Sequence, residues 1–187
     1  QRRVRCGGLR FPGSHGFHGI PKFEKAPELY ALVNGKRQKS QHCLSNPKLL
    51  EAVVAATKQR LKSGATIVGM GPNDGGHFCE CEKCRALDGG DFDPFSNEPS
   101  VTDRYIWFFN QVLDKLPEYP DAKVAFYIYH SYMRPPVKHK PNPRIMGALA
   151  PIALDRVHGF SNPLSPEKHY ARWLYAEWGK ILPELYD

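Results

Sequence analysis

Three cysteines stand close enough together in the sequence to bind a metal ion. Cys79, Cys81 and Cys84 combine a Cys-x-Cys with a Cys-x-x-Cys spacing. Zinc takes four tetrahedral ligands, and spacing this short lets one tight turn present several thiolates. Cys43, which stands just before a predicted helix, is the natural fourth ligand. The pattern therefore predicts a closed, structural metal site, with Zn²⁺ as the candidate ion.

The same thiols permit two alternatives. A histidine, His42 or His77, could replace Cys43 as the fourth ligand. In an oxidising compartment, Cys43 could instead form a disulfide with one cysteine of the cluster while the other two pair with each other. Disulfides between such closely spaced cysteines are strained, which favours the metal. Cys6 is expected to be a lone buried thiol, because five cysteines cannot all pair within one chain.

An acidic side chain follows the apolar run of residues 65–70, which is typical of a strand buried on both faces of a sheet. This run leads into Pro72-Asn73-Asp74-Gly75, where proline and glycine predict a sharp turn. Barrel enzymes place their catalytic groups at the carboxyl ends of strands, so Asp74 is the first catalytic candidate. The alternative is that Asn-Asp-Gly serves only as turn chemistry, with its side chains bonded to the local backbone.

Hydrolysis of a glycosidic bond commonly needs a second carboxyl group, which acts as nucleophile or activates water. Asp155 lies just beyond a later predicted strand and is the second catalytic candidate. Glu80 and Asp103 stay open as alternative partners of Asp74. A substrate that supplied its own nucleophile would need a second carboxylate only to orient it.

Several polar and aromatic residues follow other predicted strands and would face the same opening. Tyrosine and histidine can hydrogen-bond sugar hydroxyls, and aromatic faces can stack on sugar rings. Arg156, with His158, could bind a sugar carboxylate, although a surface ion pair is the commoner explanation. The tyrosines could also simply fill the core. The predicted substrate-binding residues are His15, His18, Asn73, Tyr127, Tyr129, His130 and Arg156.

The elements that must position these residues alternate between helix and strand. A helix is predicted to begin at Pro47, after a cap at Ser45 or Asn46, and to end at Gly64. Asn34-Gly35 predicts a turn. The other expected elements are helices from about Thr102 to Leu116 and from Ser165 onward, one or two helical turns over residues 27–32, and strands over residues 3–11, 65–70, 123–129 and 145–152.

Apolar strands that alternate with helices indicate an α/β fold with a parallel sheet of the (β/α)-barrel type. A complete barrel has eight strands and about 250 residues. This chain has 187 residues and about four or five predicted strands. We therefore expect a single barrel-type domain over residues 1–187, as a partial TIM barrel, with a smaller open sheet as the alternative.

The formal charge of +7 makes nucleic acid a partner to consider. The basic residues are scattered, however, and are dense only over residues 1–5 and 138–140. A solvated basic surface is therefore the better interpretation. No apolar run approaches the length needed to cross a bilayer. The chain opens directly on a strand-like segment with no visible signal peptide, as expected of a chain whose start has been removed.

An ordered set of motifs resembles a known family. The segments at residues 27–37, 43–47, 72–75 and 78–84 occur in the order found in the bacterial family called domain of unknown function 4838, and Arg156, His158, Asn162 and Trp173 resemble its C-terminal part. The resemblance covers nearly the whole chain. It implies a secreted or periplasmic protein with a barrel related to α-glucuronidases and hexosaminidases, in which the acid follows a central strand.

The resemblance also implies that the barrel is incomplete, because the chain stops near residues 185–187, where the family pattern would continue into another strand. A fragment of a larger chain is therefore one interpretation.

Three functions follow from these observations. The first is a glycoside hydrolase-like domain that acts on or binds a carbohydrate. The second is a non-catalytic carbohydrate-binding or scaffold domain with a structural metal site. The third, which the scattered charge disfavours, is a zinc-containing nucleic-acid-binding protein. No organic cofactor is expected, and the sequence does not determine the sugar, the linkage or the oligomeric state.

Overall fold

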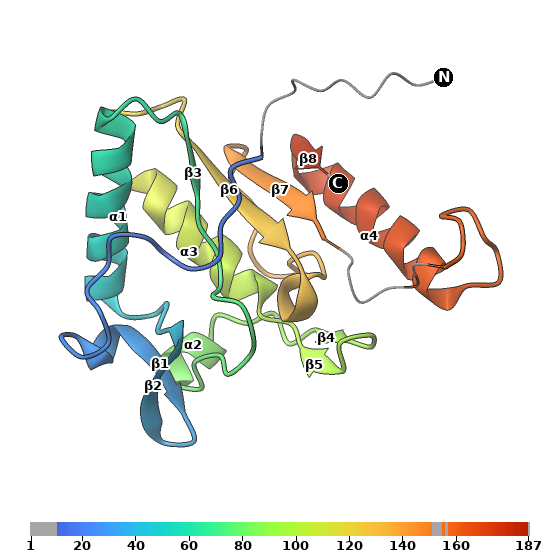
Figure 1. The fold of residues 1–187 in the computed structure, drawn as a ribbon, viewed down its shortest axis with the longest axis horizontal. Coiled ribbons are helices and arrows are strands. Elements are labelled where there is room, and N and C mark those ends of the chain that lie inside the picture. Colours follow the sequence, from blue (N-terminus) through green and yellow to red (C-terminus); the bar gives the residue numbers. More distant parts are fainter. Residues whose placement is uncertain (1–10, 151–154, 156, 187) are drawn as a thin grey trace.

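A parallel sheet forms the centre of the molecule (Figure 1). The structure is a computed structural model that describes residues 11–150, 155 and 157–186. The four strands are hydrogen-bonded in chain order and run parallel to one another. They are β3 (Ile67–Gly69), β6 (Lys123–Ile128), β7 (Ile145–Leu149) and β8 (Glu184–Tyr186). The predicted α/β class and parallel sheet are confirmed, whereas the described residues form an open sheet and no closed barrel.

Three long helices accompany the sheet, and their starts follow the sequence signals. They are α1 (Pro47–Lys62), α3 (Thr102–Asp114) and α4 (Pro166–Ile181). The side chain of Asn46 caps α1 by accepting a hydrogen bond from the Lys48 amide. The side chain of Ser165 caps α4 in the same way through the Lys168 amide. The predicted cap and start of α1 and the predicted start of α4 are therefore confirmed.

The two helices that cross between strands lie on one face of the sheet. The ring of Phe126, on β6, contacts Phe109 of α3 and Trp178 of α4, with centroid distances of 5.4 and 5.9 Å. Since alternate residues of a strand face opposite sides, Tyr127 must face away from both helices. There it contacts Phe11, from the N-terminal segment that crosses the sheet in Figure 1.

The prediction of helical turns over residues 27–32 is wrong in its second half. Only η1 (Pro27–Leu29) is helical, as one 3₁₀ turn. The chain then enters an antiparallel hairpin of β1 (Tyr30–Val33) and β2 (Lys36–His42). Asn34 and Gly35 both adopt positive φ, as a tight hairpin turn requires, so the Asn-Gly signal outweighed the weak helical pattern before it.

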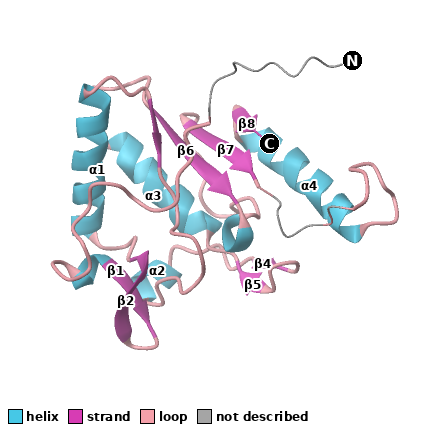
Figure 2. Cartoon of the chain, in the orientation of Figure 1, coloured by secondary structure: helices cyan, strands magenta, loops and turns pink. Residues whose placement is uncertain are grey.

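Short elements complete the chain and are drawn by type in Figure 2. The cysteine-rich loop contains one helical turn, and a small hairpin precedes α3. These elements are α2 (Glu82–Arg85), β4 (Phe92–Asp93), β5 (Glu98–Pro99) and η2 (His130–Tyr132). No helix among the described residues is both long and apolar enough to cross a membrane.

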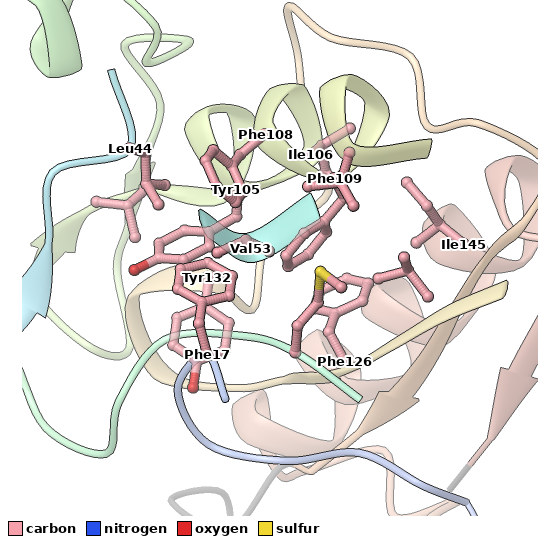
Figure 3. Close-up of a cluster of buried hydrophobic side chains, with 14 of the residues drawn as sticks. Phe17, Leu44, Val53, Tyr105, Ile106, Phe108, Phe109, Phe126, Tyr132 and Ile145 are labelled. Carbon is pink, nitrogen blue, oxygen red and sulfur yellow. The ribbon is translucent and has the colours of Figure 1, made fainter. Parts of the chain in front are cut away.

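One face of α3 supplies much of the hydrophobic core (Figure 3). Tyr105, Ile106, Phe108 and Phe109 are all at most 1% exposed. They pack between the sheet residue Phe126 and the segments that carry Phe17 and Leu44. This core anchors both the sheet and the hairpin region against the same helix.

The remaining strand predictions have mixed outcomes. The expected strands at residues 65–70, 123–129 and 145–152 are confirmed as β3, β6 and β7, each somewhat shorter than predicted. Most of the strand predicted over residues 3–11 lies outside the described residues, as do residues 151–154, Cys6 and Arg156. The last strand, β8, pairs with β7 and places the chain's final described residues at the edge of the sheet.

Candidate functional site

The turn that carries Asp74 is held by a buried glutamine of β2. The side-chain amide of Gln41 donates to the carbonyls of Asn73 and Gly75 at 2.8 and 3.0 Å, and its oxygen accepts from the Asn73 amide at 2.9 Å. Gln41 is 0% exposed, so these bonds are protected from water. Because Gln41 satisfies the backbone of the turn, the carboxylate of Asp74 is not required to do so.

Asp74 instead lines a cavity of about 220 Å³ at the carboxyl ends of β3, β6 and β7. The other lining residues are His15, Tyr127, Tyr129 and Ala150. The hydroxyl of Tyr129 donates to Oδ1 of Asp74 at 3.2 Å. The structure thus brings together four residues that the sequence predicted for one site, from three separate segments of the chain.

The rings around this cavity offer a partly aromatic wall. The ring of His15 lies 5.6 Å from that of Tyr127 and 6.3 Å from that of Tyr129. Burial, and then the negative charge of Asp74, raise the pKa of Tyr129 above its ordinary value. The Tyr129 hydroxyl therefore stays protonated at neutral pH and remains a donor to the carboxylate.

Other predicted substrate-binding residues lie outside the lining of this cavity. His18 is exposed and shares a hydrogen bond with Ser14 at 3.0 Å. Asn73 donates through its side chain to the carbonyl of Ser40 at 2.7 Å. Nδ1 of the His130 ring lies 2.8 Å from the hydroxyl oxygen of Ser131 and 3.6 Å from Oε2 of Glu98. Arg156 lies outside the described residues, so its predicted role stays untested.

Two of the possible partner carboxylates are bonded to backbone amides elsewhere. Glu80 accepts from the Asn34 amide at 2.8 Å, in the turn of the β1–β2 hairpin. Asp103 is 2% exposed, and its carboxylate accepts three amides of the loop after η2 at 2.7 to 3.0 Å. Neither residue lines the cavity of Asp74.

The carboxylate of Asp155 is likewise hydrogen-bonded to groups close to it in the sequence. It accepts from the amides of Val157 and His158 at 2.9 and 3.1 Å, and from the hydroxyl of Ser165 at 2.7 Å. These bonds, above all the one from Ser165, hold the pKa of Asp155 well below its usual range. The carboxylate therefore braces the approach to α4, and its predicted role as catalytic partner of Asp74 stays a prediction.

Gln41, the residue that shapes the turn, is not among the residues that the sequence predicts for the site. A glutamine in a polar stretch of β2 carries no signal of its own, because only the tertiary structure brings it to Asn73 and Gly75. Ala150 was missed for a similar reason, since it contributes only its position after β7.

A second candidate site is formed by four sulfur atoms beside the hairpin. The ligand atoms of Cys43, Cys79, Cys81 and Cys84 all lie within 4.8 Å of one another. The Cys43 sulfur is 3.8 Å from that of Cys81 and 3.9 Å from that of Cys84. Tetrahedral Zn–S bonds of about 2.3 Å would place sulfurs about 3.8 Å apart. The four cysteines are free thiols, at separations well beyond a disulfide bond.

Backbone amides and one cation support this cysteine cluster. The amide of Leu32 donates to the sulfur of Cys79 at 3.3 Å, and that of Ser45 to Cys84 at 3.4 Å. Hydrogen bonds from neighbouring thiols, and further ones from Arg37 and Ser45, lower the pKa of Cys43. Such donors stabilise negative sulfur, so the residues present could hold a metal ion without help from a histidine.

Comparison with known proteins gives one result. The family model described as Domain of unknown function (DUF4838) matches residues 11–186. The chain belongs to this family. A search of curated proteins and a search of solved structures found no match. The match spans both the Asp74 cavity and the cysteine cluster of this chain.

Proposed function

We propose that this DUF4838 chain supplies a sugar-binding cleft of the glycoside hydrolase kind, with Asp74 as its acidic group. The observation that carries the proposal is the cavity at the carboxyl ends of β3, β6 and β7, in which the hydroxyl of Tyr129 holds the carboxyl group of Asp74. Aromatic walls with a few convergent polar groups are typical of sugar sites.

In the proposed reaction, the carboxyl group of Asp74 gives its proton to the glycosidic oxygen as the bond from that oxygen to the sugar breaks. A water molecule then bonds to the freed anomeric carbon, and the proton that this water loses restores the carboxyl group of Asp74. Tyr129 would fix the orientation of Asp74 through its hydrogen bond. The faces of His15 and Tyr127 would lie against the sugar ring and exclude water from one side of it.

A non-catalytic carbohydrate-binding domain is the second candidate, and one observation favours it. Among the described residues that line the cavity, Asp74 is the sole carboxylate. Hydrolysis by two carboxylates would need a second group about 5 to 10 Å away. In a hydrolase, the substrate itself or a group not among the cavity-lining residues would have to provide that function.

We propose further that this sheet is part of a barrel, and the order of its strands and the place of its helices support this. Its strands follow one another in chain order, and α3 and α4 both contact the same residue, Phe126, on one face. Barrels are wound in this way, with helices outside and active-site loops at the carboxyl ends of the strands. A doubly wound sheet would instead carry helices on both faces.

The test compares the full-length protein with three variants on a panel of oligosaccharides. Asp74→Asn should lower hydrolysis at least 100-fold, because it removes the proton donor. Tyr129→Phe should lower it roughly 10-fold, because it removes one hydrogen bond to that group. Tyr119→Phe is the matched control, because Tyr119 lies outside the cleft and no hydrogen bond of its hydroxyl is present among the described residues. Its hydrolysis should stay within about 2-fold of the wild type.

Equal hydrolysis by the wild type and Asp74→Asn would remove Asp74 from the acid role. Binding of a glycan without hydrolysis, weakened by Tyr129→Phe, would establish the non-catalytic candidate instead. Absence of both binding and hydrolysis across the panel would overturn the sugar cleft altogether.

We also propose that the cysteine cluster holds a structural Zn²⁺ ion. Its sulfur separations match a tetrahedral site, and four thiolates leave no open position for substrate. The ion would join the β1–β2 hairpin, through Cys43, to the loop that follows the Asp74 turn. It would thereby stabilise β2, whose Gln41 holds the Asp74 turn, without contributing to the reaction.

Elemental analysis should find about one zinc per chain. Cys84→Ser should lose that zinc and lower the melting temperature by at least about 10 °C, because the bound metal contributes to folding. Cys6→Ser is the control, and its zinc content should not change. If Cys84→Ser does not fold, the zinc content and thiol reactivity of the wild type still test the proposal. A wild-type protein with neither zinc nor reactive thiols would show that the cysteines form disulfides instead.

A further inference from the structure

A second hollow lies on the other side of the Asp74 turn. It is a groove of about 350 Å³ between the segment from Phe17 to Glu24 and the β1–β2 hairpin. Asn73 lines this groove, whereas the next residue, Asp74, lines the sugar cleft. The two hollows therefore share the turn but have different walls. A volume of this size is within the range of small-molecule sites.

Aromatic rings form one wall of the groove. The ring of His42 lies 4.9 Å from that of Tyr30 and 5.2 Å from that of Phe17. The Tyr30 hydroxyl donates to the carbonyl of Pro21 at 2.9 Å, which fixes its ring in place. Phe23 packs edge-on against Tyr30 at 5.3 Å. These contacts hold the rings in fixed positions beside the groove, with 4 to 9% of Phe17, Tyr30 and His42 left exposed.

A polar group within this wall lacks a partner. His42 is 4% exposed, and its Nδ1 is buried with no hydrogen bond among the described residues. Buried polar atoms are nearly always paired, so a lone one calls for an explanation. The ring of His42 also lines the groove, so a ligand hydroxyl or carboxylate bound there is a candidate partner for this imidazole.

The rim of the groove carries unpaired charges. Lys22, Lys39 and Glu24 line it, and none of the three makes an ion pair within the described part of the chain. Two ammonium groups against one carboxylate leave a net positive rim. Free lysines next to an aromatic wall suit a ligand with one flat face and one negative group.

We propose that this groove is a second binding site, distinct from the sugar cleft, for a small ring-shaped organic carboxylate. The aromatic rings would cover the face of the ligand, Lys22 and Lys39 would neutralise its carboxylate, and His42 would hydrogen-bond one of its oxygens. An acidic sugar and a free cyclic acid share this chemistry. Binding here requires no reaction at Asp74, so the inference stands apart from the proposed function.

The experiment titrates the full-length protein with D-glucuronate, D-glucose and benzoate, and follows binding by NMR shifts of backbone amides. D-Glucuronate should bind with a dissociation constant on the order of 1 mM and shift amides around Lys22 and Lys39. D-Glucose, its neutral counterpart, should bind at least about 5-fold more weakly at this site. Benzoate distinguishes the two possible kinds of ligand. If benzoate binds as tightly as D-glucuronate, the site takes a free cyclic acid. If benzoate binds more weakly than D-glucuronate, the site takes an acidic sugar.

Charge variants supply the matched control. Lys22→Gln with Lys39→Gln should weaken D-glucuronate binding roughly 3- to 10-fold, and raised salt should weaken it in the wild type. Lys25→Gln with Lys36→Gln changes the net charge equally at exposed lysines outside the groove, and should leave binding within about 2-fold. Glu24→Gln should strengthen binding, because it removes the opposing charge.

Three outcomes would overturn the proposal. Equal affinity for D-glucose and D-glucuronate would show that the lysines do not bind the carboxylate of the ligand. Equal loss in the two double variants would show only a general charge effect. Shifts confined to His15, Asp74 and Tyr129 would assign the ligand to the sugar cleft, and would leave the proposed function intact while removing this second site.

Discussion

Asp74 is available for chemistry because a different side chain holds its turn together. The buried side chain of Gln41 makes three hydrogen bonds to the backbone of Asn73 and Gly75. In an Asn-Asp-Gly turn, the aspartate side chain often makes such bonds to the turn backbone itself. The carboxylate then accepts a hydrogen bond from Tyr129, the residue that follows β6. Asp155 shows the opposite situation, because its oxygens are taken up by nearby amides and a hydroxyl.

At the residue scale, Asp155→Asn should destabilise the protein at neutral pH and leave any hydrolysis unchanged. The folded-state pKa of Asp155 is depressed, so its stabilising effect is present above the unfolded value of about 4. That effect is lost as the pH falls from about 4 through the lower folded-state pKa. The difference in melting temperature between the two proteins should therefore shrink as the pH is lowered from about 7 to about 2.

Glu177→Gln is the control for this comparison, because its ion pair with Lys180 is on the exposed surface of α4. A difference between wild type and Asp155→Asn that stays constant from neutral pH to acid would contradict the interpretation. Lost hydrolysis in Asp155→Asn, with unchanged stability, would restore Asp155 as the catalytic partner.

At the scale of elements, the irregular loops are fixed by side chains from regular elements. Asp103, in the first turn of α3, accepts three successive amides of residues 137–139. Arg104, the next residue, is paired with Asp88 and donates to the Cys79 carbonyl at 2.8 Å. The start of α3 thus positions two loops at once, one of which carries the cysteine cluster.

Asp103→Asn should therefore destabilise the fold by about 1 to 3 kcal/mol, because an amide can replace only one of the two carboxylate oxygens. Denaturant unfolding measures this change, and hydrogen exchange of amides 137–139 should accelerate. Asp114→Asn, at the exposed end of the same helix, is the charge-matched control and should stay within about 0.5 kcal/mol. An unchanged exchange rate in Asp103→Asn would contradict this account of the loop.

At the scale of the whole molecule, the N-terminal segment completes the sugar cleft by crossing the sheet. Glycine at position 69 makes this approach possible, since a Cβ there would overlap the backbone carbonyl of Pro12. His15 then follows on the same segment and reaches the cavity. The close passage of two backbones is what delivers a residue from near the chain start to the carboxyl end of β3 (Figure 1).

Gly69→Ala should displace this segment and destabilise the protein by about 1 to 3 kcal/mol. It should also weaken glycan binding, because His15 moves with the segment. Gly179→Ala is the control: no atom lies near its added Cβ, and alanine favours a helix, so it should stabilise α4 slightly. Unfolding curves and glycan titrations of both variants test the prediction, and wild-type glycan binding by Gly69→Ala would contradict it.

The sequence by itself determined the local features. Caps and prolines marked the starts of α1 and α4, apolar runs marked β3, β6 and β7, and the cysteine spacing marked the cluster, because each signal acts over a few neighbouring residues. It failed at residues 30–32, where hairpin pairing with β2, a contact between separate segments, outweighed a weak helical pattern.

Only the tertiary structure decided which of the candidate side chains meet. In the folded chain, Tyr129 donates to Asp74, Asp103 accepts from backbone amides of a distant loop, and Gln41 bonds to the Asp74 turn. The partners in these three contacts lie 32 to 55 positions apart in the sequence. Such pairs depend on how strands and loops pack across the whole chain. Their geometry comes from the summed burial of many side chains, which no short stretch of sequence contains.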